Sequence, residues 1–165
     1  MHSSITLIGM AGAGKTSVGK VLSLKLGKRF VDSDQEIERE QSMALKDIIL
    51  KKGKDKFIEI EKQSILTLNF DEIVLSTGGS VIFSEDAMKY ICKNSLVLYL
   101  RVRFEKILER VSNLKSRGFI SESGQTFEQE FFRRVKLYER HADHIIDNDT
   151  SIEACVKSIQ FLLKK

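Results

Sequence analysis

The sequence predicts an α/β fold: three α/β/α layers built on a five-stranded parallel sheet. Short apolar runs alternate along the chain with stretches of helical periodicity, and glycines end several of these stretches. Such alternation favours parallel strands that are covered by helices on both faces. A chain of 165 residues suits one core, so we expect residues 1–165 to form a single domain.

In the first half of the chain, two strands are each followed by helices. Residues 5–9 form a short apolar run that ends in Gly9, which is typical of a buried strand. Residues 15–26 carry apolar side chains at helical spacing, and Gly27 ends that helix. A second strand at 29–32 is followed by helices at 35–41, 44–52 (which Gly53 closes) and 56–68.

The second half continues the alternation. A strand at 73–77 runs into two glycines, and Ser84 and Thr126 are typical N-cap residues at the start of helices at 85–92 and 126–141. The remaining expected elements are strands at 96–100 and 144–147 and helices at 104–111 and 151–163. Right-handed crossovers place the carboxyl ends of all parallel strands at one edge of the sheet, so polar residues after the strands should meet there.

Charge and composition argue against two classes of partner. The net charge is +4, but acidic residues are interleaved with basic ones, so we assign the excess to phosphate ligands and expect no nucleic acid. No apolar run approaches the ~20 residues of a membrane helix, and no signal peptide precedes the first strand. We therefore expect a cytoplasmic protein; we also expect a monomer. Cys92 and Cys155 are far apart and are expected to be unpaired core residues.

Residues 9–16 read Gly-Met-Ala-Gly-Ala-Gly-Lys-Thr, the spacing of a P-loop, and stand between an expected strand and an expected helix. Its glycines let backbone N–H groups point at phosphate oxygens, and the helix adds its positive end. Lys15 should reach the β- and γ-phosphates of ATP, and the Thr16 hydroxyl should ligate Mg²⁺. The residues expected to bind ATP here are Gly12, Ala13, Gly14, Lys15, Thr16 and Ser17.

Two carboxylates, Asp32 and Asp34, follow the second strand. One can hold the metal, and the other can accept a proton from a hydroxyl that is being phosphorylated. A helix N-cap is the alternative role, and Asp34 can serve as both cap and base.

Arginines are candidates for neutralising the transferring phosphoryl group, although a single arginine is more often a solvated surface charge. Residues 112–125 are polar and lack periodicity, so we expect a mobile segment whose closure would bring Arg117 to the phosphates. The other candidates are Arg110, Arg133 and Arg134.

The order and spacing of these motifs resemble the shikimate kinase family over nearly the whole chain. The opening is the P-loop with Gly19, followed by Phe30-Val-Asp32-Ser-Asp34-x-x-Ile37-Glu38. The middle is Phe57-x-x-x-Glu61 and Ser76-Thr77-Gly78-Gly79. The end is Arg117-Gly118 and Arg134-x-x-x-Tyr138-x-x-x-Ala142-Asp143.

The resemblance implies a P-loop fold of the nucleoside-monophosphate-kinase type, with a lid at about 112–125 and an acceptor-binding region at about 33–62. It implies transfer of a phosphoryl group from ATP, with Mg²⁺, to a small hydroxy acid, most simply shikimate in aromatic amino-acid biosynthesis. The catalytic residues that it implies are Lys15, Asp34 and Arg117; Thr16 and Asp32 serve the metal, and Arg110 lies near adenine. The acceptor-binding residues that it implies are Asp34, Phe57, Glu61, Gly78, Gly79 and Arg134.

Three positions depart from the family pattern. Ile58 replaces the arginine of Phe-Arg-x-x-Glu, and Ser80 replaces a third glycine. The lid motif, which usually continues with proline and leucines, here reads Arg117-Gly118-Phe119-Ile120. The missing arginine is the second partner of the acceptor carboxylate. Two alternatives to shikimate phosphorylation therefore stay open: a kinase of the same fold with a different small alcohol as acceptor, and a nucleotide-binding protein with little catalysis.

A lysine could replace the missing guanidinium. Lys54 and Lys56 are candidates by position, whereas Lys62 points about 100° round the helix from Glu61 and is a poor one.

Overall fold

The computed structural model describes residues 3–110 and 124–164 and confirms the α/β fold with a five-stranded parallel sheet. The strands are β1 (Ile5–Ile8), β2 (Arg29–Asp32), β3 (Ile73–Ser76), β4 (Leu96–Arg101) and β5 (His144–Asp147). The helices are α1 (Lys15–Leu26), α2 (Ser33–Gln41), α3 (Leu45–Lys52), α4 (Lys54–Leu66), α5 (Glu85–Asn94), α6 (Phe104–Arg110), α7 (Phe127–His141) and α8 (Ile152–Leu162), with a 3₁₀ turn η1 (Val81–Phe83).

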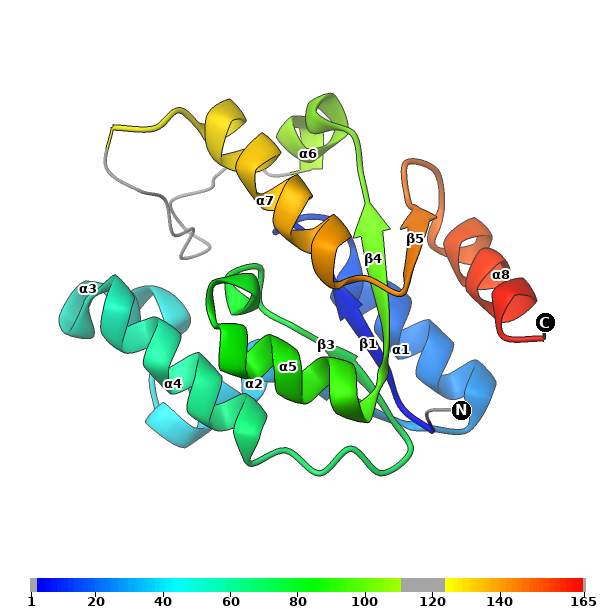
Figure 1. The fold of residues 1–165 in the computed structure, drawn as a ribbon, viewed down its shortest axis with the longest axis horizontal. Helices are drawn as coiled ribbons and strands as arrows, with labels where there is room; N and C mark the ends of the chain where they lie inside the picture. The colour runs from blue at the N-terminus through cyan, green and yellow to red at the C-terminus, as the bar shows by residue number, and fades with distance from the viewer. Residues whose placement is uncertain (1–2, 111–123, 165) are drawn as a thin grey trace.

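Helices cover both faces of the sheet, as Figure 1 shows. α5 and α7 lie over the face turned toward the viewer, whereas α1 lies behind the sheet and packs against α8. α2, α3 and α4 form a separate group at one side of the molecule, and α4 also packs against α5. This group has its own small apolar cluster of Ile37, Ile48 and Phe57, apart from the main core. The chain therefore has a sheet core and a smaller helical lobe beside it.

Strand order and register bring the polar ends of three strands together. The order is β2-β3-β1-β4-β5, so β1 and the P-loop after it lie at the centre of the sheet. Ser76 pairs with Asp32 on one side and with Leu7 on the other. The carboxyl ends of β1, β2 and β3 therefore finish at one level, as the sequence predicted.

Most expected elements are confirmed, with small shifts at their ends. The helix expected at 35–41 begins at Ser33, because Asp32 caps it, and the helix expected at 56–68 spans 54–66. The three-residue turn η1 was not predicted.

The expected mobile segment at 112–125 falls mainly on residues 111–123, which lie outside the described residues. Cys92 and Cys155 are unpaired, as expected. Among the described helices, none combines the length and the apolar character that spanning a bilayer requires.

Candidate active site

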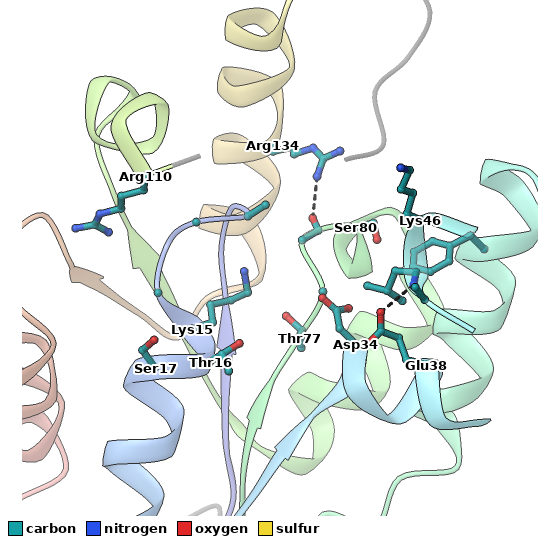
Figure 2. Close-up of a pocket in the computed structure, with 18 residues that line it drawn as sticks. Lys15, Thr16, Ser17, Asp34, Glu38, Lys46, Thr77, Ser80, Arg110 and Arg134 are labelled. Carbon is teal, nitrogen blue, oxygen red and sulfur yellow. Dashed lines mark hydrogen bonds between the residues drawn. The ribbon is translucent and has the colours of Figure 1, made fainter. Parts of the chain in front are cut away.

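A cavity of about 560 Å³ opens where the carboxyl ends of β1, β2 and β3 meet. Figure 2 shows that the P-loop, the Thr77–Ser80 turn and the α2–α4 lobe surround it. The predicted site residues that line it are Gly12, Gly14, Lys15, Thr16, Ser17, Asp34, Phe57, Gly78, Gly79, Arg110 and Arg134. The lining residues that the sequence did not single out as site residues are Ala11, Glu38, Ala44, Leu45, Lys46, Thr77 and Ser80.

The first turn of α1 is left open for an anion. Its N-cap, Gly14, is left-handed at φ 90° and offers no side-chain acceptor, and the first turn contains no acidic residue. The other described helices either have a capping side chain or carry an acid in the first turn. Unsatisfied N–H groups and the positive end of the helix dipole therefore face the cavity at α1.

Lys15 lies folded over its own loop. Its buried ammonium donates to the carbonyls of Gly9 at 2.7 Å and Met10 at 2.9 Å. Burial lowers the pKa of Lys15 to about 8, although the nearby Asp34 carboxyl opposes that shift. A phosphate oxygen in the loop would offer this ammonium the anionic partner that it lacks here.

Asn148 supports the loop from behind and was missed by the sequence analysis. Its side-chain amide donates to the carbonyl of Ala13 at 2.7 Å, and its own carbonyl accepts from Arg110 at 2.8 Å. A Cβ added at Gly14 would lie 2.8 Å from this amide, so glycine is required there. The available signal was a polar residue directly after the last strand.

Asp32 joins the nucleotide side of the cavity to the lobe. Its Oδ2 accepts from the Thr16 hydroxyl at 2.7 Å, and its Oδ1 accepts from the Asp34 amide at 3.1 Å as the N-cap of α2. The capping role that the sequence allowed for Asp34 is therefore wrong, because Asp32 fills it. The carboxyl of Asp34 is left to face the cavity (Figure 2).

The environment of Asp34 suits a proton acceptor. Burial raises the pKa of this carboxyl to about 6, and the Lys15 ammonium limits the rise. A group with a pKa just below neutral pH is mostly ionised there and still binds a proton readily.

Glu61 lies beneath the acceptor side as a buried acid with one unsatisfied oxygen. Its Oε2 accepts from the Ser80 hydroxyl at 2.7 Å, whereas Oε1 has no partner among the described residues. Burial raises the pKa of Glu61 to about 8, and the neighbouring Asp34 carboxyl adds to the rise. A Cβ added at Gly78 would lie within 2.6 Å of both acids, so this turn passes directly over them. Ser80 thus has a physical role: it is the hydrogen-bond donor for Glu61.

Arg134 reaches the cavity from α7 and is held on three sides. Its Nε donates to Glu130 at 2.7 Å, its Nη1 donates to the Gly79 carbonyl at 3.1 Å, and the Phe83 ring centroid lies 4.8 Å from Cζ. The Tyr138 hydroxyl donates to the same carbonyl at 2.7 Å. The guanidinium is therefore fixed in position before any ligand arrives.

Several other positions named in the sequence analysis, Asp32 and Arg133 among them, do not line the cavity or lie outside the description. Ala13 is fully buried within the P-loop, and Glu61 is buried against Ser80 of the cavity wall. Ile58 is half-buried on α4 and is not among the described lining residues. Arg117 belongs to the residues outside the description, so its role stays a prediction. Gly78, a residue expected to bind the acceptor, donates its amide to the Ser33 hydroxyl at 3.0 Å.

Known proteins resemble this chain along most of its length. A family model described as shikimate kinase matches residues 11–163. Shikimate kinase of Dictyoglomus turgidum is 33% identical over 154 residues, which cover 90% of each protein. The enzyme of Persephonella marina is 37% identical over 136 residues, or 82% of this chain and 83% of the relative. A structure of shikimate kinase from Acinetobacter baumannii in complex with shikimate superposes with a TM-score of 0.86 at 30% identity, covering 99% of this chain and 94% of the other.

The buried acid Glu61 predicts a pH-dependent stability. Between the ordinary pKa of 4.5 and the folded-state value of about 8, the folded protein keeps a proton that the unfolded chain releases. The free energy of unfolding should therefore fall as pH rises through this window, by up to about 1.4 kcal/mol per unit. Urea unfolding at pH 5–8 should show wild type losing stability relative to Glu61→Gln, which cannot titrate.

The matched control for this prediction is Glu40→Gln, at an exposed position on α2. It should follow the wild-type pH dependence. A constant difference between wild type and Glu61→Gln across the pH range would show that Glu61 does not hold a proton in the folded state.

Proposed function

This chain belongs to the shikimate kinase family, a family of ATP-using phosphotransferases, and from that premise we propose that it phosphorylates shikimate to shikimate 3-phosphate. One observation carries the proposal: the P-loop and Asp34 line the same cavity, so a nucleotide phosphate and an acceptor hydroxyl can meet there. The similar structure from Acinetobacter baumannii, described as a complex with shikimate, supports this acceptor. The reaction belongs to aromatic amino-acid biosynthesis, and we propose that it takes place in the cytoplasm and is carried out by a monomer.

The nucleotide side positions the phosphates. The open first turn of α1 supplies backbone N–H groups, and the Lys15 ammonium can swing from the carbonyls of its own loop to the β- and γ-phosphates. Arg110, on the opposite side of the P-loop from Asp34 in Figure 2, would lie toward the nucleoside. These groups neutralise the charge that spreads over the γ-phosphoryl oxygens during transfer.

On the acceptor side, Asp34 orients a hydroxyl group of the acceptor and takes its proton. The hydroxyl oxygen forms a bond to the γ-phosphorus as the bond from that phosphorus to the β,γ-bridging oxygen breaks, and ADP leaves with the electron pair. Arg134 would pair with the acceptor carboxylate. Phe57 gives the lobe side of the cavity an apolar wall.

The residues at the P-loop also fit Mg²⁺. The Thr16 hydroxyl donates its proton to Asp32, and its oxygen lies 3.4 Å from the Ser76 hydroxyl, which leaves at least one lone pair to bind a cation. Within the described residues no cluster of three acidic, His or Cys side chains forms a metal cage. Mg²⁺ fits such a site, because it usually takes few protein ligands together with phosphate oxygens and water. When bound, the ion would neutralise β- and γ-phosphate charge.

The proposal is tested by measuring ADP release from ATP and Mg²⁺ against a panel of hydroxy acids that includes shikimate. We expect shikimate to stimulate ADP release and the product to be phosphorylated shikimate by mass spectrometry. Stimulation by another alcohol, with none by shikimate, would assign a different acceptor, and no stimulation by any member would favour a binding protein.

Lys15→Ala should abolish phosphoryl transfer and leave the fold intact. The loss of a charge contact to the transferring group typically costs about 10²–10³ in rate. The hydrogen bonds that Lys15 makes go only to carbonyls of the P-loop, so any loosening should stay in that loop. Steady-state kinetics together with thermal unfolding measure the two effects. Near-normal turnover would contradict the phosphate-loop assignment.

Asp34→Asn should lower kcat by roughly 10²–10⁴, the usual value of a general base, with little change in the KM for ATP. In wild type, kcat/KM for the acceptor should fall below about pH 6, because Asp34 then carries a proton and cannot accept another. The kinetics of both proteins from pH 5 to 8 measure this, with Glu40→Gln as the control. An unchanged kcat in Asp34→Asn would leave Asp34 without a catalytic role.

A further inference from the structure

The acceptor side of the cavity is rich in acids. Asp34 and Glu38 line it, and Glu61 lies directly beneath it. An anionic acceptor entering this space needs cationic partners to offset the loss of solvent and the nearby carboxyl groups. Arg134 is one such partner, but its Nε and Nη1 are already engaged by Glu130 and by the Gly79 carbonyl. A second cation would complete the recognition of a carboxylate.

The lysines of helix α4 are not among the residues that line the cavity, so none of them is placed as this second cation. Lys54 lies 5.8 Å from the ring centroid of Phe83, and Lys62 forms an ion pair with Glu59 at 2.7 Å. Lys56 lines a separate hollow between α2 and α4. Ile58 offers only apolar surface. Lys54 thus shares the Phe83 ring with Arg134, but none of these three lysines lines the cavity.

Lys46, in the first turn of α3, lies at the cavity, unlike the lysines of α4. It lines the cavity, its side chain is exposed, and it makes no ion pair or hydrogen bond with the part of the chain that the structure describes. Figure 2 shows it on the acceptor side, close to Ser80 in the view, with its ammonium directed toward the end of the cavity where Arg134 lies. Its charge is thus available to a ligand.

The backbone that carries Lys46 is held in place. Glu38 accepts a hydrogen bond from the Leu45 amide at 2.9 Å, and Leu45 packs on the apolar cluster of Ile37, Ile48 and Phe57. Phe57 also lines the cavity. The base of the lysine is therefore fixed to the acceptor wall, while its four-carbon stem lets the ammonium follow a ligand.

We propose that Lys46 pairs with the carboxylate of the acceptor, together with Arg134, and that it determines the preference of this site for a charged acceptor. This assignment rests on the proposed function. Lys46 on α3 would then bind the acceptor carboxylate in place of the arginine that the family pattern has on α4, where this chain has Ile58.

The test compares Lys46→Ala, Lys46→Arg and Lys46→Glu in steady-state assays at low ionic strength. Lys46→Ala should raise the KM for shikimate about tenfold with kcat and the KM for ATP unchanged, which is the low end expected for a charged hydrogen bond at an exposed position. Lys46→Arg should stay near wild type, and Lys46→Glu should raise the KM further. Lys51→Ala, exposed on the same helix, is the matched control and should change nothing.

A second acceptor separates charge recognition from packing. With shikimate methyl ester, which lacks the carboxylate charge, wild type and Lys46→Ala should have the same KM. An unchanged KM for shikimate in Lys46→Ala, or an equal rise for shikimate and its ester, would overturn the assignment while shikimate kinase activity stands. If wild type does not phosphorylate shikimate at all, the proposed function fails, and the assignment of the carboxylate to Lys46 fails with it.

Discussion

The unpaired N–H groups at the start of α1 are the constraint on which the rest of the structure depends. Without a side-chain cap they are open to water or to an anion, and they keep their direction only if the loop before them keeps its shape. Asn148 holds the loop at Ala13, and Lys15 folds over it from the front. β1 lies at the centre of the sheet, and its pairing with β3, and that of β3 with β2, brings the ends of all three strands to the same level. The side chains that follow β2 and β3 therefore lie beside the P-loop.

The sequence predicted much of this because the signals are local. Apolar runs, glycines and cap residues mark the strands and helices, and the fixed spacing of the P-loop marks the phosphate site. Strand order, Asn148 and Lys46 could not be predicted, because they depend on contacts between distant parts of the chain. Ala13 and Asn148, for example, are 135 residues apart. Lys46 looks like any lysine of a solvated helix until the fold brings α3 to the cavity.

The acceptor side shows how Glu61 is accommodated although position 58 carries no arginine. Without an arginine at position 58, the buried Glu61 would be a costly anion, and the structure instead gives it a hydroxyl partner at Ser80 and a pKa that favours the neutral form. Two departures from the family pattern, Ile58 and Ser80, are therefore physically compatible with each other. With isoleucine in place of the guanidinium on α4, the Glu61 carboxyl keeps one donor, at Oε2, and its Oε1 is left without a partner among the described residues.

The two hydrogen bonds of Asp32 bear on how the ATP-binding and acceptor-binding halves of the site are aligned with each other. One of its oxygens starts the helix that carries Asp34, and the other holds the hydroxyl of Thr16 in the P-loop. The donor and acceptor halves are thus joined through a single side chain of two rotatable bonds. Because both hydrogen bonds end on one carboxylate, a shift of either half would carry the other with it, which would limit changes in their relative position. For a reaction in which a 1 Å misplacement can cost about a hundredfold in rate, this shared anchor acts as a reference point for both substrates.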